Sequence, residues 1–114
     1  MTITIPIRLV SVANVREHWA KRAARAKEHR ALANLFCRLE RPTPLPVTVR
    51  IARISPRPLD DDNLRSACKA LRDGIADALG VDDRSPLVTW EYEQERGKPK
   101  EYAARIVITP RPES

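Results

Sequence analysis

The sequence predicts an α/β (α+β) fold in the order β-α-β-α-β-β, with one mixed β-sheet and two main helices packed on it. Four short segments alternate apolar and polar residues, which is the period of a half-buried strand. Two longer segments, 15–39 and 62–79, repeat apolar residues every three or four positions, which is the period of a helix. The 114 residues suffice for one core, so we expect a single domain over residues 1–114.

The first predicted strand spans residues 2–10 and is followed by a long helix. One side of this strand carries Ile3, Ile5, Ile7 and Leu9. Pro6 has no N–H to donate, which indicates an edge strand or a break. Residues 15–39 contain no Gly or Pro. Their apolar stripe is strong only near the end, so we expect a buried C-terminal half and a basic ridge in the N-terminal half.

The middle of the chain is predicted to form a strand and a second helix. Residues 41–46 hold three prolines and favour an extended connector. Residues 47–55 alternate as a strand. An amphipathic helix should begin near Asp62 and stop at Gly80, because Asp suits a helix start and Gly suits the position after a helix end.

The last two predicted strands cover residues 87–95 and 101–109. A turn at Arg96-Gly97-Lys98-Pro99 separates them. Two alternating segments joined by a short Gly-containing loop are typical of a β-hairpin, so we expect these strands to pair with each other.

The charge is distributed unevenly along the chain. The net charge is +6, and residues 1–58 carry 12 basic and 3 acidic side chains, whereas residues 59–114 carry 9 and 12. Such an asymmetry favours a polyanionic partner, most simply nucleic acid. A basic surface that only maintains solubility is the alternative.

Several function classes are disfavoured by composition. The apolar runs are too short for a membrane span, so no membrane partner is expected. The first ten residues lack a basic region and a cleavage site, which predicts a cytoplasmic protein.

Cys37 and Cys68 lack the spacing of a zinc site and are expected to be buried. His18 and His29 are too far apart to share a metal and are expected to face solvent or DNA.

Five aspartates flank the second predicted helix. They are Asp60, Asp61 and Asp62 before it and Asp82 and Asp83 after it. Adjacent carboxylates repel unless something neutralises them. Mg²⁺ accepts one or two protein carboxylates and completes its shell with water and phosphate, so these aspartates could form a metal site. The alternative to a metal site is that one aspartate caps the helix and the others lie in a solvated loop. A metal-dependent reaction on a phosphodiester would use both the basic half and the acidic groups.

Trp19 begins the basic part of the first predicted helix. It would either pack on the sheet with Val15 and Ala23, or stack on an unpaired nucleic-acid base. Both interpretations remain open from the sequence.

Three motifs occur in a fixed order along the chain. They are Asp60-Asp61-Asp62-Asn63, then Lys69 and Asp73 in Lys-x-x-x-Asp spacing, then Asp82-Asp83, with Asn14 after the first strand. In this order the chain resembles the RusA family of Holliday-junction resolvases, often carried by phages and prophages. The resemblance covers nearly the whole chain and implies a RusA-like fold.

The resemblance also implies roles for individual residues. Asp60, Asp62 and Asp83 would be the catalytic, metal-binding carboxylates, and Lys69 would be the catalytic or phosphate-contacting lysine. Asp73, Asp82 and Asn63 would support them. One departure concerns the lysine, which in the family follows the Asn by three residues, where this chain has Ser66. Lys69 comes three residues later, about 4.5 Å further along the helix axis.

The expected function is therefore a Mg²⁺-dependent endodeoxyribonuclease, with Mn²⁺ as a substitute, that resolves four-way DNA junctions as a homodimer. A C2 dimer would present two identical sites to two opposed strands. The expected phosphate contacts are Arg16, Lys21, Arg22, Arg25, Lys27, Arg30, Arg50 and Arg53. Two alternatives remain: a non-catalytic basic DNA-binding protein, and a metal-dependent nuclease acting on other branched DNA.

Overall fold

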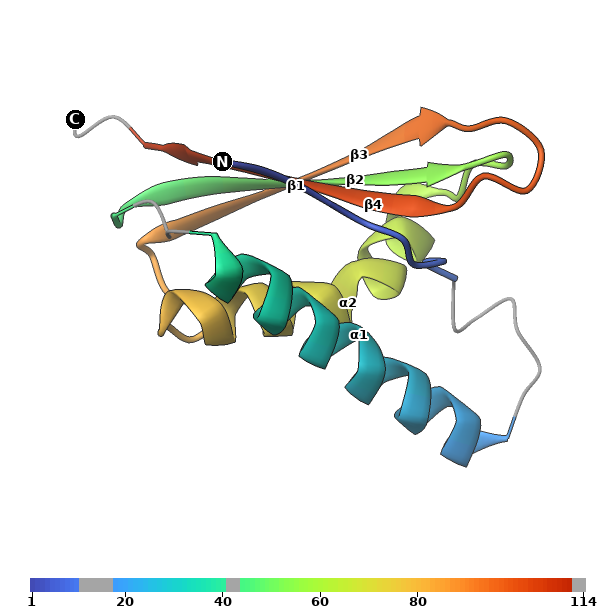
Figure 1. Ribbon diagram of the computed structural model, residues 1–114, viewed down its shortest axis with the longest axis horizontal. Helices are drawn as coiled ribbons and strands as arrows, with labels where there is room; N and C mark the ends of the chain where they lie inside the picture. Colours follow the sequence, from blue (N-terminus) through green and yellow to red (C-terminus); the bar gives the residue numbers. More distant parts are fainter. Residues whose placement is uncertain (11–17, 41–43, 112–114) are drawn as a thin grey trace.

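The computed structural model describes residues 1–10, 18–40 and 44–111, and it confirms the predicted α+β fold (Figure 1). One mixed sheet carries both helices on the same face. The elements in chain order are β1 (Thr2–Ile5), α1 (Trp19–Leu39), β2 (Val47–Ser55), α2 (Asp61–Leu79), β3 (Val88–Arg96) and β4 (Ala103–Pro110). The expected start of the first helix, at 15–17, lies outside the described residues.

The four strands lie in the order β1-β4-β2-β3. Strand β2 pairs in parallel with β3 and antiparallel with β4, and β4 also pairs antiparallel with β1. The predicted hairpin of the last two strands is therefore wrong, because β2 lies between them. Strand β2 is mostly buried and takes a central position, whereas β3 exposes Glu91, Glu93 and Glu95 and takes an edge. The chain then passes the end of β2, where the Gly97 N–H donates to the Ser55 carbonyl at 3.0 Å.

The first strand is shorter than predicted. It ends at Ile5, and the Ile7 N–H donates to the Ile5 carbonyl at 2.9 Å, which turns the chain around Pro6. Proline cannot supply the next ladder hydrogen bond, so the pairing stops there. Ile7 and Leu9 remain buried all the same, because the segment after the turn stays against the core.

Helix α2 follows its sequence signals closely. Asp60 is its N-cap, and Gly80 ends it in the left-handed conformation with φ 73°. The apolar stripe faces the sheet, where Leu71 and Ile75 are fully buried beside Ile51, Ile106 and Ile108. This packing fixes which side of α2 is left for polar residues.

Helix α1 is buried only in its C-terminal part. Its buried residues are His29, Ala33 and Cys37, while the first turns extend past the sheet (Figure 1). This confirms the expected basic N-terminal half and also the burial of Cys37 and Cys68. Within the described ranges, no helix is long and apolar enough to cross a membrane.

Candidate nucleic-acid interface and acidic site

The N-terminus of α2 is built around Asp60. Its Oδ1 accepts from the Asn63 N–H at 2.9 Å, and its Oδ2 accepts from the Asn63 side-chain amide at 3.0 Å. Asp61 and Asp62 occupy the first turn and are exposed. Acidic groups here interact favourably with the helix dipole. Asp60 therefore acts as a helix cap, and Asn63 supports it directly.

A second acidic group lies two turns further along α2, around Lys69. The Lys69 Nζ donates to Asp73 Oδ1 at 2.8 Å and to Asp83 Oδ2 at 2.9 Å. The hydrogen bond to Asp73, followed by that to Asp83, raises the pKa of Lys69. The hydrogen bond from Lys69 in turn lowers the pKa of Asp83. The loop after α2 thus folds back onto the helix and brings the second and third sequence motifs together.

Three side chains that the sequence analysis did not single out hold Asp83 in place. Arg72 donates to the Asp83 carbonyl at 2.8 Å and to the Tyr92 hydroxyl at 2.9 Å. The Trp90 Nε1 donates to the same carbonyl at 3.0 Å, and the Arg72 guanidinium lies 4.7 Å from the Trp90 ring. Two signals pointed to this arrangement: Arg72 follows Lys69 by one helical turn, and Trp90 and Tyr92 share one face of a strand.

The structure does not bring Asp60, Asp62 and Asp83 together as one metal site. Among the described residues, no three His, Cys, Asp or Glu side chains form a group that could hold a metal ion. Asp60 and Asp62 lie at the start of α2, whereas Asp83 contacts Lys69 near its middle. Asp82 is exposed and accepts from the Arg84 N–H at 2.8 Å. A single ion bound by all three predicted ligands does not fit this arrangement.

Two carboxylates do converge, because Asp73 and Asp83 contact the same ammonium group. Mg²⁺ needs only one or two protein carboxylates, so this pair matches its ligand chemistry. Asp73 was predicted only as a supporting residue. The structure places Asp73 and Asp83 on the same Lys69 ammonium group.

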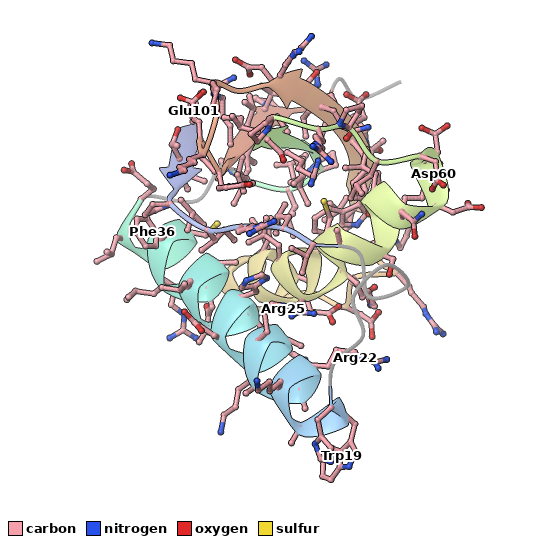
Figure 2. All side chains as sticks on the ribbon, turned by 90° about the vertical axis from the view of Figure 1, so that its right-hand side faces the viewer. Trp19, Arg22, Arg25, Phe36, Asp60 and Glu101 are labelled. Atoms are coloured by element: carbon pink, nitrogen blue, oxygen red, sulfur yellow. The ribbon has the colours of Figure 1, made fainter. Side chains whose placement is uncertain are left out.

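The predicted phosphate-contacting residues separate into three groups. Lys21, Arg22 and Lys27 are exposed on α1, and Arg25 is half-buried there. Figure 2 shows Arg22 and Arg25 along α1, on a different part of the molecule from Asp60. Arg16 lies outside the described residues.

Arg30 belongs to a second group, because it joins the two helices. Its Nε and Nη2 donate to the two carboxylate oxygens of Asp77 at 2.7 and 2.9 Å, which ties α1 to α2. This hydrogen bond lowers the pKa of Asp77. Arg30 therefore joins the two helices, and its phosphate contact stays a prediction, since its side chain is 55% exposed.

The two strand arginines form the third group, and neither joins the α1 surface. Arg50 alternates with buried Val49 and Ile51, so it lies on the helix-free face of the sheet, where it contacts Glu91 at 3.0 Å. Arg53 is 6% exposed and donates to the carbonyls of Leu9 and Arg57 at 2.9 and 2.8 Å. The predicted DNA contact by Arg53 is wrong, because its side chain satisfies buried backbone carbonyls.

His18 is exposed as expected, whereas His29 is not, and Trp19 lacks the packing on the sheet that one interpretation predicted. Trp19 is 72% exposed, so it does not pack on the sheet. The His18 Nδ1 accepts from the Ala20 N–H at 3.2 Å and caps α1. His29 is buried, contrary to its predicted exposure, and burial followed by the nearby Arg25 charge lowers its pKa.

Comparison with known proteins gives similarity without an assigned activity. No protein-family model matches the chain. An uncharacterized protein of Xylella fastidiosa (strain Temecula1) is 35% identical over 111 residues, which cover 84% of this chain and 65% of that protein. The chain thus spans less than two thirds of the length of this relative.

Proposed function

We propose that the protein is a RusA-like endodeoxyribonuclease that resolves four-way DNA junctions by paired phosphodiester hydrolysis, with Mg²⁺ or Mn²⁺ as its cofactor. One observation carries this proposal: Lys69 draws Asp73 and Asp83 together beside the basic part of α1. Lys69 and Asp73 line the same cavity as Arg22 and Arg25. The same cavity is therefore lined by cations that would bind a DNA backbone and by a carboxylate suited to a divalent cation.

The residues of this site have distinct roles in the proposal. Arg22 and Arg25 bind phosphates and position the strand without reading its sequence. Lys69 keeps its charge at neutral pH and holds a phosphate oxygen near Asp83. Arg72 positions Asp83 through its backbone carbonyl. Asp73 and Asp83 would hold Mg²⁺, which supplies an activated water and charge neutralisation when bound.

The partner and location proposed here follow from the same substrate. A four-way junction has approximate two-fold symmetry, which a homodimer would match. Leu35 and Leu39 are exposed on the C-terminal half of α1 and offer an apolar surface for a second copy. We expect the protein to act on DNA in the cytoplasm during recombination and repair.

A non-catalytic DNA-binding protein is the second candidate, and a specific observation favours it. Asp60 caps α2, and Asp73 and Asp83 both accept hydrogen bonds from Lys69, so each of these carboxylates also has a structural explanation. Incubation with a synthetic four-way junction in Mg²⁺, in Mn²⁺ and in EDTA separates the two functions.

Paired cuts in opposed strands that need the metal are the expected result. Binding in every condition without cutting would favour the non-catalytic function. Equal cutting of flaps and three-way branches would indicate a nuclease for branched DNA in general.

A further inference from the structure

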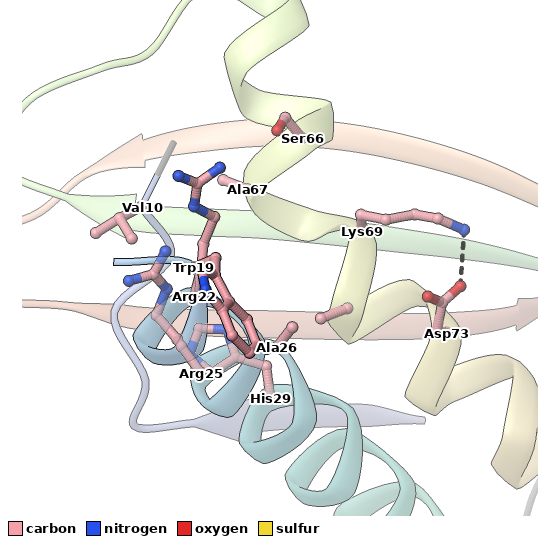
Figure 3. A pocket seen from close by; sticks show the side chains of 12 residues that line it. Val10, Trp19, Arg22, Arg25, Ala26, His29, Ser66, Ala67, Lys69 and Asp73 are labelled. Atoms are coloured by element: carbon pink, nitrogen blue, oxygen red, sulfur yellow. Dashed lines mark hydrogen bonds and ion pairs between the residues drawn. The ribbon is translucent and has the colours of Figure 1, made fainter. Parts of the chain in front are cut away.

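A cavity of about 440 Å³ lies between the first half of α1 and the middle of α2 (Figure 3). Much of its wall is made of alanine side chains: Ala23 and Ala26 from α1, and Ala67 and Ala70 from α2. Its volume falls in the range of small-molecule binding sites. Because alanines project little, the two helices leave an apolar space suited to a flat group.

The rim of this cavity combines an aromatic ring with cations. Trp19 lines it with an indole that is 72% exposed, and Arg22 and Lys69 line it from α1 and α2 respectively. In Figure 3, Trp19, Arg22 and Arg25 gather at the α1 side. Exposed aromatic rings among basic side chains are typical of surfaces that stack nucleic-acid bases while holding the backbone.

His29 provides an independent observation inside the cavity. It lines the wall and is only 7% exposed. Burial lowers its pKa, so at neutral pH the ring is uncharged and has one donor and one acceptor nitrogen. The edge of a nucleobase also carries hydrogen-bond donors and acceptors, which match these two ring nitrogens. Ser66 adds a hydroxyl on the α2 side.

We propose that this cavity binds a single unpaired nucleobase of the DNA substrate, with its flanking phosphates on Arg22 and Arg25. The inference rests on the proposed DNA function and names the feature of the DNA that the protein recognises. A purely apolar ligand would make no contact with the charges at the rim, and a simple anion would make no use of Trp19 and the alanine walls. A base with its phosphates accounts for all three.

Binding to three DNA duplexes in EDTA tests the inference without cleavage. One duplex is fully paired, one carries a single unpaired thymine, and one carries an abasic site at that position. Fluorescence anisotropy should give about tenfold tighter binding to the unpaired thymine than to the abasic duplex, because stacking on an aromatic side chain contributes roughly this much.

Variants of α1 locate the effect. Ala26→Leu fills the cavity and should remove the preference for the unpaired thymine, while Ala24→Leu, the same change at an exposed position outside the cavity, should keep it. Trp19→Ala should weaken the preference, and Trp19→Phe should retain most of it because an aromatic face remains. Circular dichroism checks that each variant is folded.

The possible results distinguish this inference from the proposed function. Equal binding to all three duplexes, or an unchanged preference in folded Ala26→Leu, overturns the base pocket and leaves the nuclease proposal standing. Free thymidine 5′-monophosphate binding as tightly as the unpaired duplex would make the cavity a mononucleotide site and overturn its assignment to DNA. Failure to bind any DNA overturns both.

Discussion

The ammonium group of Lys69 and the carboxylate of Asp83 lie 2.9 Å apart although the two residues are 14 positions apart in the chain. Lys69 simultaneously contacts Asp73 at 2.8 Å on its own helix. One side chain thus fixes where the loop after α2 meets the helix. The same loop lines a pocket together with Arg30 of α1.

Replacing Lys69 should affect cleavage far more than binding. If Lys69 holds a phosphate oxygen as proposed, Lys69→Ala should lower junction cleavage about 100-fold. Binding should weaken modestly, and the slope of log K against log salt should become less steep by about 1, as expected for one lost phosphate contact. Lys98→Ala, an exposed lysine away from this site, serves as the control. Near-normal cleavage by Lys69→Ala would remove Lys69 from the mechanism.

Most of the fold was predictable because its signals are local. The α2 boundaries follow from Asp60, Gly80 and one apolar stripe. The apolar spacing of α1 predicted its burial only in part, because Leu35 and Leu39 are exposed. Strand pairing is not local, and the sequence favoured a hairpin where β2 lies between β3 and β4. The buried sequence of β2 is the signal that could have placed it centrally.

The candidate site was predictable only in part, for a similar reason. The sequence identified Lys69, Asp73 and Asp83 as motif residues, but the contact among them depends on how the loop folds back. Arg53 was predicted to be a surface charge because it lies in an alternating strand. Its burial depends on carbonyls from other segments, which the strand pattern does not show. Side-chain environment set by distant segments is not encoded in spacing.

The close contact between the helices should be sensitive to a single methyl group. A Cβ added at Gly74 would lie 2.2 Å from the Arg30 carbonyl oxygen and 2.8 Å from the Ala33 Cβ. Gly74→Ala should therefore lower the free energy of unfolding by about 2 kcal/mol, despite the better helix propensity of alanine. Urea denaturation measures this. Ser66→Ala, on an exposed side of the same helix, should cost nothing, and equal stability of the two variants would contradict the contact.

Arg53 should be a stability residue, unlike Arg50 on the same strand. Arg53→Leu leaves the carbonyls of Leu9 and Arg57 without their donor, so the free energy of unfolding should fall by about 2 kcal/mol. Arg50→Leu makes the same change at an exposed position and should alter it by less than about 0.5 kcal/mol. If chemical denaturation gave equal losses of unfolding free energy for both variants, the hydrogen bonds of Arg53 would contribute no more to stability than the contacts of Arg50.

The contact between Arg30 and Asp77 should make stability depend on pH. The hydrogen bond from Arg30 lowers the pKa of Asp77 in the folded state. Its stabilising contribution is therefore full above the unfolded pKa of about 3.9 and is lost as pH falls through the lower folded value. Wild type should melt above Asp77→Asn at neutral pH, and the difference should vanish on acidification. A difference that grows as pH falls would contradict this sign.

Neutralising the predicted metal ligands is the most direct test of the nuclease proposal. Asp60→Asn keeps an oxygen that can cap α2, and Asp62 is exposed, so both variants should fold normally. If Asp73 and Asp83 hold Mg²⁺ as proposed, Asp73→Asn and Asp83→Asn should abolish junction cleavage. Loss of cleavage in Asp60→Asn and Asp62→Asn as well would favour the three aspartates of the RusA pattern. Binding should persist or tighten, because a negative charge near phosphate is removed. Gel assays of binding in EDTA and of cleavage in Mg²⁺ measure the two effects separately.

Asp61→Asn is the matched control, since Asp61 is exposed in the same helical turn and is not a motif position. It should remain fully active. Loss of cleavage in Asp73→Asn and Asp83→Asn, with activity kept in Asp60→Asn and Asp62→Asn, would place the metal on the pair joined by Lys69. Near-normal Mg²⁺-dependent cutting by the variants at Asp60, Asp62, Asp73 and Asp83 would remove these carboxylates from catalysis, because a metal ligand cannot lose its charge without a loss of cleavage.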